Sequence, residues 1–200
     1  ALQAQINPHF LYNTLDSIIW MGEGNKTREV VVMTSALAKL LRQSISNENE
    51  EMTIKQEESY IESYLTIQKM RYKDKLEYEI DFDKEIYNEK ILKLIIQPIV
   101  ENAIYHGIKY KETKCLLQVI GYSKGNDIII QVIENGVGMS KEVLNHIFDK
   151  HNVNYKSAGL GIYNVQKRLK LHYGKNYGIE YDSKLGIGTT ATITIPKQII

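Results

Sequence analysis

The amino-acid sequence predicts an α+β fold, in which a helical hairpin precedes a two-layer sandwich of helices and a mainly antiparallel sheet. Over the first part of the chain, apolar residues recur three or four positions apart, as they do on one face of a helix. Later segments alternate apolar and polar residues, which is typical of half-buried strands. Short turns join these segments in pairs, which favours antiparallel neighbours in one sheet.

Composition and charge limit the classes of function. The chain has 200 residues, of which 43% are hydrophobic and 24% charged, as in a folded globular protein of one medium domain and a small one. The formal net charge of +1 gives no electrostatic case for binding nucleic acid. The single cysteine, Cys115, excludes a disulfide within the chain and a cysteine-based zinc site. We expect no membrane span and no signal peptide here, and we expect the chain to be a piece of a longer protein.

The N-terminal part predicts the helical hairpin. Residues 2–21 have one apolar face, and Pro8 indicates that this helix begins nearby or kinks there. Residues 22–25 contain two glycines and break the pattern, and Thr27 can cap a second helix that runs to about Ser46. Because a lone hairpin cannot bury both of its apolar faces, we expect a dimeric four-helix bundle.

After a polar link at residues 47–51, the sequence predicts the sandwich, so we expect two domains, at residues 1–47 and 52–197. Thr53 is expected to cap a third helix that ends near Arg71. The other expected elements are a strand at 76–82, a helix at 91–108 with a kink or a late start at Pro98, a strand pair at 116–122 and 127–133, helices at 141–148 and 161–173, and strands at 178–183 and 189–195.

The first candidate binding segment lies in the expected helix at 91–108. Glu101 and Asn102 are adjacent polar residues among apolar ones, and Asn102 shares a helix face with Tyr105 and His106. A magnesium ion on nucleotide phosphates prefers hard oxygen ligands, which an amide oxygen and a nearby carboxylate supply. A helix end with a solvated Glu-Asn pair explains this segment equally well.

The second candidate segment follows an apolar strand. Glu134 ends that strand, and Gly136 and Gly138 come directly after it. Two glycines give a bend that lets the backbone approach a flat ligand, and the carboxylate can accept a hydrogen bond from an amino group. An ordinary strand-to-helix turn is the alternative.

Two more glycine-rich segments follow. Gly159, Leu160 and Gly161 lie where a helix is expected to open, so backbone N–H groups there can face an anion. The segment at 186–190 contains Thr189 and, taken alone, is typical of a turn between strands.

The order and spacing of these segments resemble the catalytic part of sensor histidine kinases of two-component signalling. Residues 52–197 are similar to the Bergerat ATP-binding domain that Hsp90, MutL and type II topoisomerases share. Residues 101–102, 134–138 and 159–164 match its N, G1 and G2 boxes. Upstream, residues 2–13 resemble the LytS/YesM-like subfamily of these kinases.

The resemblance implies an ATP- and Mg²⁺-dependent kinase whose phosphoacceptor is His9. Asn102 is then the Mg²⁺ ligand, and Glu101 polarises a water or orients the metal's ligands. Glu134 accepts from the adenine amino group, in place of the family's aspartate. Asn13 orients a water or the ring of His9, with a simple polar role on the helix surface as the alternative. The other implied cofactor-binding residues are His106, Gly136, Gly138, Gly159, Leu160, Gly161 and Thr189.

Two departures from the family pattern carry predictions. Glu134 is one methylene longer than aspartate, so its carboxylate advances by roughly 1 Å, and we expect weaker adenine binding unless the strand end retreats. Phe10 follows His9 where many histidine kinases place an acid, so the group that orients the imidazole is not the adjacent residue.

The predicted function is autophosphorylation on a histidine in a homodimer, followed by transfer to an aspartate of a response regulator. The expected location is the cytoplasmic portion of a bacterial inner-membrane sensor. An ATP-binding signalling module with weak or no kinase activity is the alternative, which Glu134 motivates. A Bergerat ATPase or an anti-sigma serine kinase is a third interpretation, but it does not explain the His9 hairpin.

Overall fold

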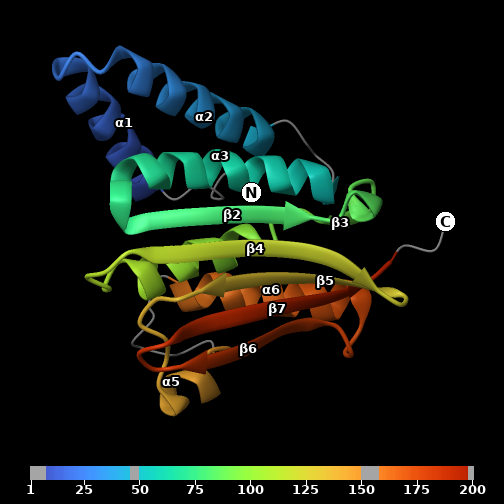
Figure 1. The fold of residues 1–200 in the computed structure, drawn as a ribbon. Coiled ribbons are helices and arrows are strands. Elements are labelled where there is room, and N and C mark those ends of the chain that lie inside the picture. Colours follow the sequence, from blue (N-terminus) through green and yellow to red (C-terminus); the bar gives the residue numbers. More distant parts are fainter. Residues whose placement is uncertain (1–7, 46–49, 150–157, 198–200) are drawn as a thin grey trace.

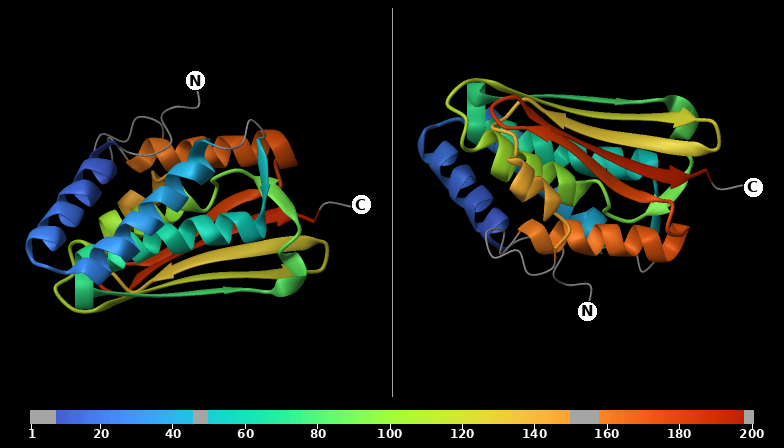
Figure 2. Two further views of the ribbon diagram at one scale, coloured as in Figure 1. Left: turned by 90° about the horizontal axis from the view of Figure 1, so that it is seen from above. Right: turned by 90° about the horizontal axis from the view of Figure 1, so that it is seen from below.

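The described residues of the computed structural model, 8–45, 50–149 and 158–197, form a five-stranded sheet with helices on one of its faces (Figure 1). Two further views show that the helices lie on the same side of the sheet (Figure 2). The helical hairpin forms an outer layer on the helix that follows it in sequence. The predicted α+β sandwich is therefore confirmed.

The hairpin consists of α1 (Pro8–Glu23) and α2 (Thr27–Ile45). Helix α1 is described from Pro8 onward, and residues 1–7 lie outside the described residues, so the expected start or kink near Pro8 stays a prediction. Met33 and Leu40 of α2 are buried in the main hydrophobic core. Part of the hairpin's apolar face therefore packs within this chain. No helix among the described residues is long and apolar enough to cross a membrane.

Helix α3 (Ile54–Tyr72) starts with the expected cap. The Thr53 hydroxyl accepts from the backbone N–H of Gln56 at 3.2 Å, and the Gln56 side chain accepts from the Thr53 N–H at 2.8 Å. Thr53 also ends a short strand that the sequence did not predict, β1 (Glu51–Thr53), which pairs antiparallel with β3 (Lys90–Leu92).

The sheet has the strand order β2-β4-β5-β7-β6. Its strands are β2 (Leu76–Phe82), β4 (Cys115–Lys124), β5 (Asp127–Glu134), β6 (Gly178–Lys184) and β7 (Gly188–Pro196). Only the β2–β4 pair is parallel among these five strands, so the expected antiparallel character is confirmed. Side chains on the inner face, such as Leu117, Val119, Ile130 and Ile193, are fully buried against the helices.

The predicted helix at 91–108 is wrong in its first part. Residues 90–92 form β3, and the helix α4 (Gln97–Asn102) begins one residue before Pro98 and continues as a π-helical segment, η3 (Ala103–Ile108). Leu94, in the connection, has a left-handed φ of 57°, which is incompatible with a helix. The proline therefore marks a late start and not a kink.

Two other helix boundaries differ from the prediction. Helix α5 (Lys141–Asn145) ends before the expected residue 148 and is capped by Ser140, whose hydroxyl accepts from the Val143 N–H. Helix α6 (Ala158–Tyr173) begins three residues before Gly161. The remaining elements are the short 3₁₀ turns η1 (Lys73–Lys75) and η2 (Lys84–Ile86).

Candidate active site

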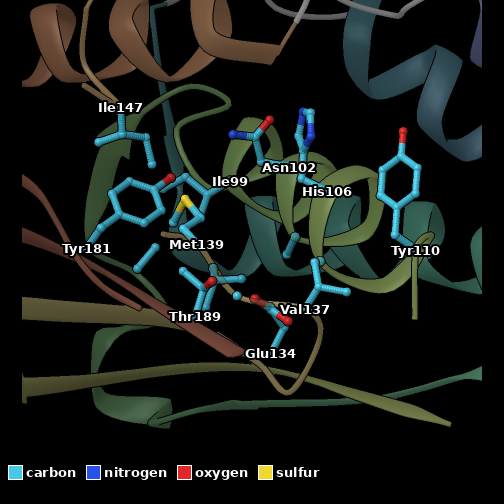
Figure 3. A pocket seen from close by; sticks show the side chains of 15 residues that line it. Ile99, Asn102, His106, Tyr110, Glu134, Val137, Met139, Ile147, Tyr181 and Thr189 are labelled. Atoms are coloured by element: carbon cyan, nitrogen blue, oxygen red, sulfur yellow. The ribbon is translucent and has the colours of Figure 1, made fainter. Parts of the chain in front are cut away.

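A cavity of about 270 Å³ opens between the helical segment α4–η3 and the strands β5, β6 and β7 (Figure 3). Most of its wall is apolar, with a few polar groups that converge on it, which is typical of a small-molecule site. The structure brings together in this wall five of the residues that the sequence analysis proposed, Asn102, His106, Glu134, Gly138 and Thr189.

Glu134 lies on the strand side of the cavity. It is the last residue of β5, stands opposite Thr189 of β7, and is only 5% exposed. One carboxylate oxygen accepts a hydrogen bond from the backbone N–H of Gly136. A carboxylate that is buried in an otherwise apolar wall favours a ligand with a hydrogen-bond donor. The Thr189 hydroxyl lies 2.8 Å from the Ser183 hydroxyl, so the two share a hydrogen bond beside it.

The absence of side chains at two glycines, where the backbone packs closely, leaves room for this carboxylate. A Cβ atom added to Gly107 would lie 2.7 Å from the carboxyl carbon of Glu134, and one added to Gly136 would clash with both Glu134 and Gly107. The carbonyl of Gly107 also accepts from the Val137 N–H at 3.1 Å. From the sequence we assigned no role to Gly107. A glycine five residues after Asn102, at the end of the same expected helix, is the signal that would have indicated one.

Gly138 makes the bend that the sequence predicts. Its φ is +65°, a left-handed conformation, and a Cβ at this position would clash with the Lys184 carbonyl. The next residue, Met139, lines the cavity.

Asn102 and His106 reach the cavity from the helical side, one turn apart on the same face (Figure 3). Burial, together with the nearby charge of Lys109, lowers the pKa of His106, which favours the neutral imidazole. The π-helical turn that carries His106 is a local irregularity of the kind that often occurs at functional sites.

Glu101 does not line the cavity with Asn102. Its carboxylate accepts from the Gln97 side chain at 2.6 Å, and burial raises its pKa. Burial raises the pKa of Tyr60 and Tyr64 on α3, and the nearby charge of Glu101 adds to the rise in both. The two adjacent residues of the predicted pair therefore face different surroundings.

His9 also lies outside the cavity wall, on the exposed side of α1. The Asn13 amide nitrogen is 3.1 Å from each ring nitrogen of His9, so the two side chains are in contact on the surface of α1, and the orienting role of Asn13 stays a prediction. Phe10 points the other way, is 8% exposed, and packs against Tyr64 with ring centroids 5.1 Å apart. Phe10 therefore anchors α1 and leaves the imidazole beside it on the surface.

Gly159, Leu160 and Gly161 are helical and lie in the first described turn of α6. The segment before that turn, 150–157, lies outside the described residues. A Cβ at Gly161 would be 3.6 Å from the Cβ of Pro98, so the start of α6 lies against the start of α4. The N-terminal end of α6 is thus close to the helix that carries Asn102.

Comparison with known proteins agrees with this geometry. The family "Histidine kinase-, DNA gyrase B-, and HSP90-like ATPase" matches residues 87–199, and the family "Histidine kinase" matches residues 1–76. The sensor histidine kinase YesM of Bacillus subtilis is 36% identical over 98% of this chain and 33% of its own length. The sensor histidine kinase YpdA of Escherichia coli is 35% identical over 99% of this chain and 34% of its own. The chain thus spans about a third of these relatives.

Solved structures show the same fold. The catalytic domain of the histidine kinase ThkA superposes with a TM-score of 0.55 at 16% identity, over 74% of this chain and 94% of that one. The histidine kinase AdeS of Acinetobacter baumannii superposes with a TM-score of 0.54 at 17% identity, over 100% of this chain and 99% of that one.

Proposed function

Because this chain belongs to the histidine kinases with a DNA gyrase B- and HSP90-like ATPase domain, we propose that it binds ATP in the cavity beside Glu134 and transfers the γ-phosphoryl group to His9. The observation that carries the proposal is the buried carboxylate of Glu134 in an apolar wall, opposite the Asn102 amide. This arrangement suits an adenine whose amino group donates to Glu134 and whose phosphates lie on the helical side.

The helical side of the cavity fits the phosphates. The start of α6, as described, lies beside α4, so the positive end of its helix dipole is close to the helix of Asn102. Among the described residues, no group of three His, Cys, Asp or Glu side chains could hold a metal. A Mg²⁺ ion that is held mainly by phosphates and water, with the Asn102 amide oxygen as a protein ligand, fits this donor set; it would neutralise phosphate charge during transfer.

The position of His9 fits a phosphoacceptor that approaches the nucleotide from outside the cavity. Its ring is on the α1 surface, and Asn13 restrains it. Neutral imidazole is a nucleophile at physiological pH, so transfer depends mainly on bringing His9 and the γ-phosphate together. Since His9 is not in the cavity wall, that approach requires a movement of the hairpin or a second subunit.

The hairpin also supports a homodimer. Several large apolar side chains stay exposed on α1 and α2, and such exposed apolar surface favours an interaction with a second subunit. A charged residue among them, such as Ile19→Glu, should convert a dimer into monomers in light-scattering measurements, without loss of helical circular dichroism. The exposed set is Tyr12, Leu15, Ile19, Trp20, Val31 and Val32.

The relatives' names support the wider role, in which the phosphoryl group passes to an aspartate of a response regulator. YesM and YpdA are described as sensor histidine kinases, and each is about three times as long as this chain. We propose that the chain is the cytoplasmic catalytic portion of such a membrane-bound sensor.

The decisive experiment incubates the 200-residue chain with radiolabelled ATP and Mg²⁺. We expect an acid-labile, alkali-stable label on the protein, which His9→Ala removes and the matched control His172→Ala keeps. ATP binding without any label would favour the alternative, an ATP-binding module without kinase activity. Label that survives in His9→Ala would refute the assignment of the phosphoacceptor.

A further inference from the structure

Tyr181 contributes the one buried hydroxyl in the cavity wall that makes no hydrogen bond to the described part of the chain. It lies on β6, two strands away from Glu134, and its ring packs edge-on against Phe148 with centroids 5.9 Å apart. In Figure 3 its hydroxyl end is directed into the cavity, toward the side where Met139 and Ile99 lie. A buried hydroxyl without a partner is unfavourable, so such a group in a binding cavity indicates a partner that arrives with the ligand.

Strand register places Tyr181 and Glu134 on the same face of the sheet, two strands apart. Glu134 stands opposite Thr189 on β7, and Tyr181 stands opposite Ala191, two residues further along the same strand. With about 4.8 Å between strands and about 3.4 Å per residue, the Cα atoms of Glu134 and Tyr181 are about 12 Å apart. Both side chains face the helical layer, so a planar heterocycle of purine size fits between the carboxylate and the hydroxyl.

We propose that Tyr181 is a specificity-determining residue, whose hydroxyl donates a hydrogen bond to an unprotonated ring nitrogen of the purine that Glu134 holds by its amino group. This inference rests on the proposed ATP site. A carboxylate accepts from the amino group on one edge of adenine, and a hydroxyl donor two strands away meets a ring acceptor at another edge. The pair therefore recognises the base by a donor and an acceptor at once.

Tyr181 stays a donor at every physiological pH. Burial raises its pKa well above the usual value of tyrosine, so the hydroxyl keeps its proton. Its register partner Ala191 and the neighbouring Val132 are apolar and almost fully buried, so water is largely excluded from this end of the cavity.

Tyr181→Phe tests the proposal because it removes only the oxygen. We expect the Kd of the 200-residue chain for ATP, measured by calorimetry, to rise about three- to tenfold, the usual value of one hydrogen bond. The matched control Tyr122→Phe removes a hydroxyl from β4, outside the cavity wall, and should leave the Kd unchanged. An unchanged Kd in Tyr181→Phe overturns the inference, whereas an unmodified chain that does not bind ATP overturns the proposed function itself.

Two further measurements separate recognition from a structural role. We expect one of 1-deaza-, 3-deaza- and 7-deaza-ATP to bind the unmodified chain more weakly than ATP does. The Tyr181→Phe variant should bind this analogue and ATP equally well. If Tyr181→Phe weakens ATP binding and no analogue shows this coupling, the hydroxyl does not contact a ring nitrogen and the inference is wrong. Without nucleotide, Tyr181→Phe should unfold at the same temperature as the unmodified chain or a higher one, because an unpaired buried hydroxyl is removed. A lower melting temperature would indicate a structural hydrogen bond and would also contradict the inference.

Discussion

Glu57 on α3 connects the helical layer to the start of the active-site helix, and it makes the stability of the protein depend on pH. It is completely buried, and its Oε1 accepts from the backbone N–H of Ile96, the residue before α4, at 2.6 Å. Burial raises the pKa of this carboxyl from 4.5 to about 7, although hydrogen bonds from the N–H groups of Ile96 and Leu94 and the charge of Arg168 act in the opposite direction.

The sign of the effect follows from proton linkage. Between pH 4.5 and about 7, the folded chain holds a proton on Glu57 that the unfolded chain has released. The free energy of unfolding therefore falls as the pH rises through this range, and it levels off above the folded-state pKa. From pH 5 to pH 8 the loss due to this one group is about 2–3 kcal/mol.

Urea unfolding of the unmodified chain and of Glu57→Gln at pH 5 and pH 8 measures this loss. Glutamine keeps an acceptor for the Ile96 N–H but cannot ionise. The unfolding free energy of the Glu57→Gln variant, relative to that of the unmodified chain, should therefore be about 2–3 kcal/mol higher at pH 8 than at pH 5. The exposed Glu62→Gln on the same helix is the matched control and should show no such change. A difference between Glu57→Gln and the unmodified chain that is the same at both pH values would refute the reasoning.

Three other substitutions test the site and the fold. Gly107→Ala places a methyl group 2.7 Å from the Glu134 carboxyl carbon, so ATP affinity in calorimetry should fall at least about tenfold; unchanged affinity would show that the carboxylate can move away. Glu134→Asp restores the family's shorter acid and should tighten ATP binding about threefold, and an equal Kd would remove the predicted handicap of the glutamate. Thr53→Ala removes one half of the capping box and should lower the free energy of unfolding in urea by about 1 kcal/mol, whereas no loss would mean that the β1–β3 pairing alone holds the start of α3.

Local patterns in the sequence were sufficient for most of the helices and strands. The hairpin helices, the Thr53 cap and the β4–β5 hairpin each depend on residues within a few positions of one another, so periodicity and turn residues predict them. The glycine-rich segments around Gly136 and Gly138 were also recognisable, because a sharp bend needs particular residue types in a short stretch.

Contacts between distant segments decided the rest. The three-residue strands β1 and β3 form only by pairing with each other, so neither carries a periodic signal, and β3 takes the place of the first residues of the predicted helix at 91–108. The packing of Gly107 on Glu134 and the placing of Tyr181 in the wall of the same cavity join residues 27 and 47 positions apart in sequence. The sequence by itself therefore determined most of the elements, the family and the residue types of the proposed ATP site. Only the tertiary structure decided that Glu101 faces α3, that Glu57 is buried under α4 and that Tyr181 has an unpaired hydroxyl, because burial and hydrogen-bond partners are set by segments that meet only after folding.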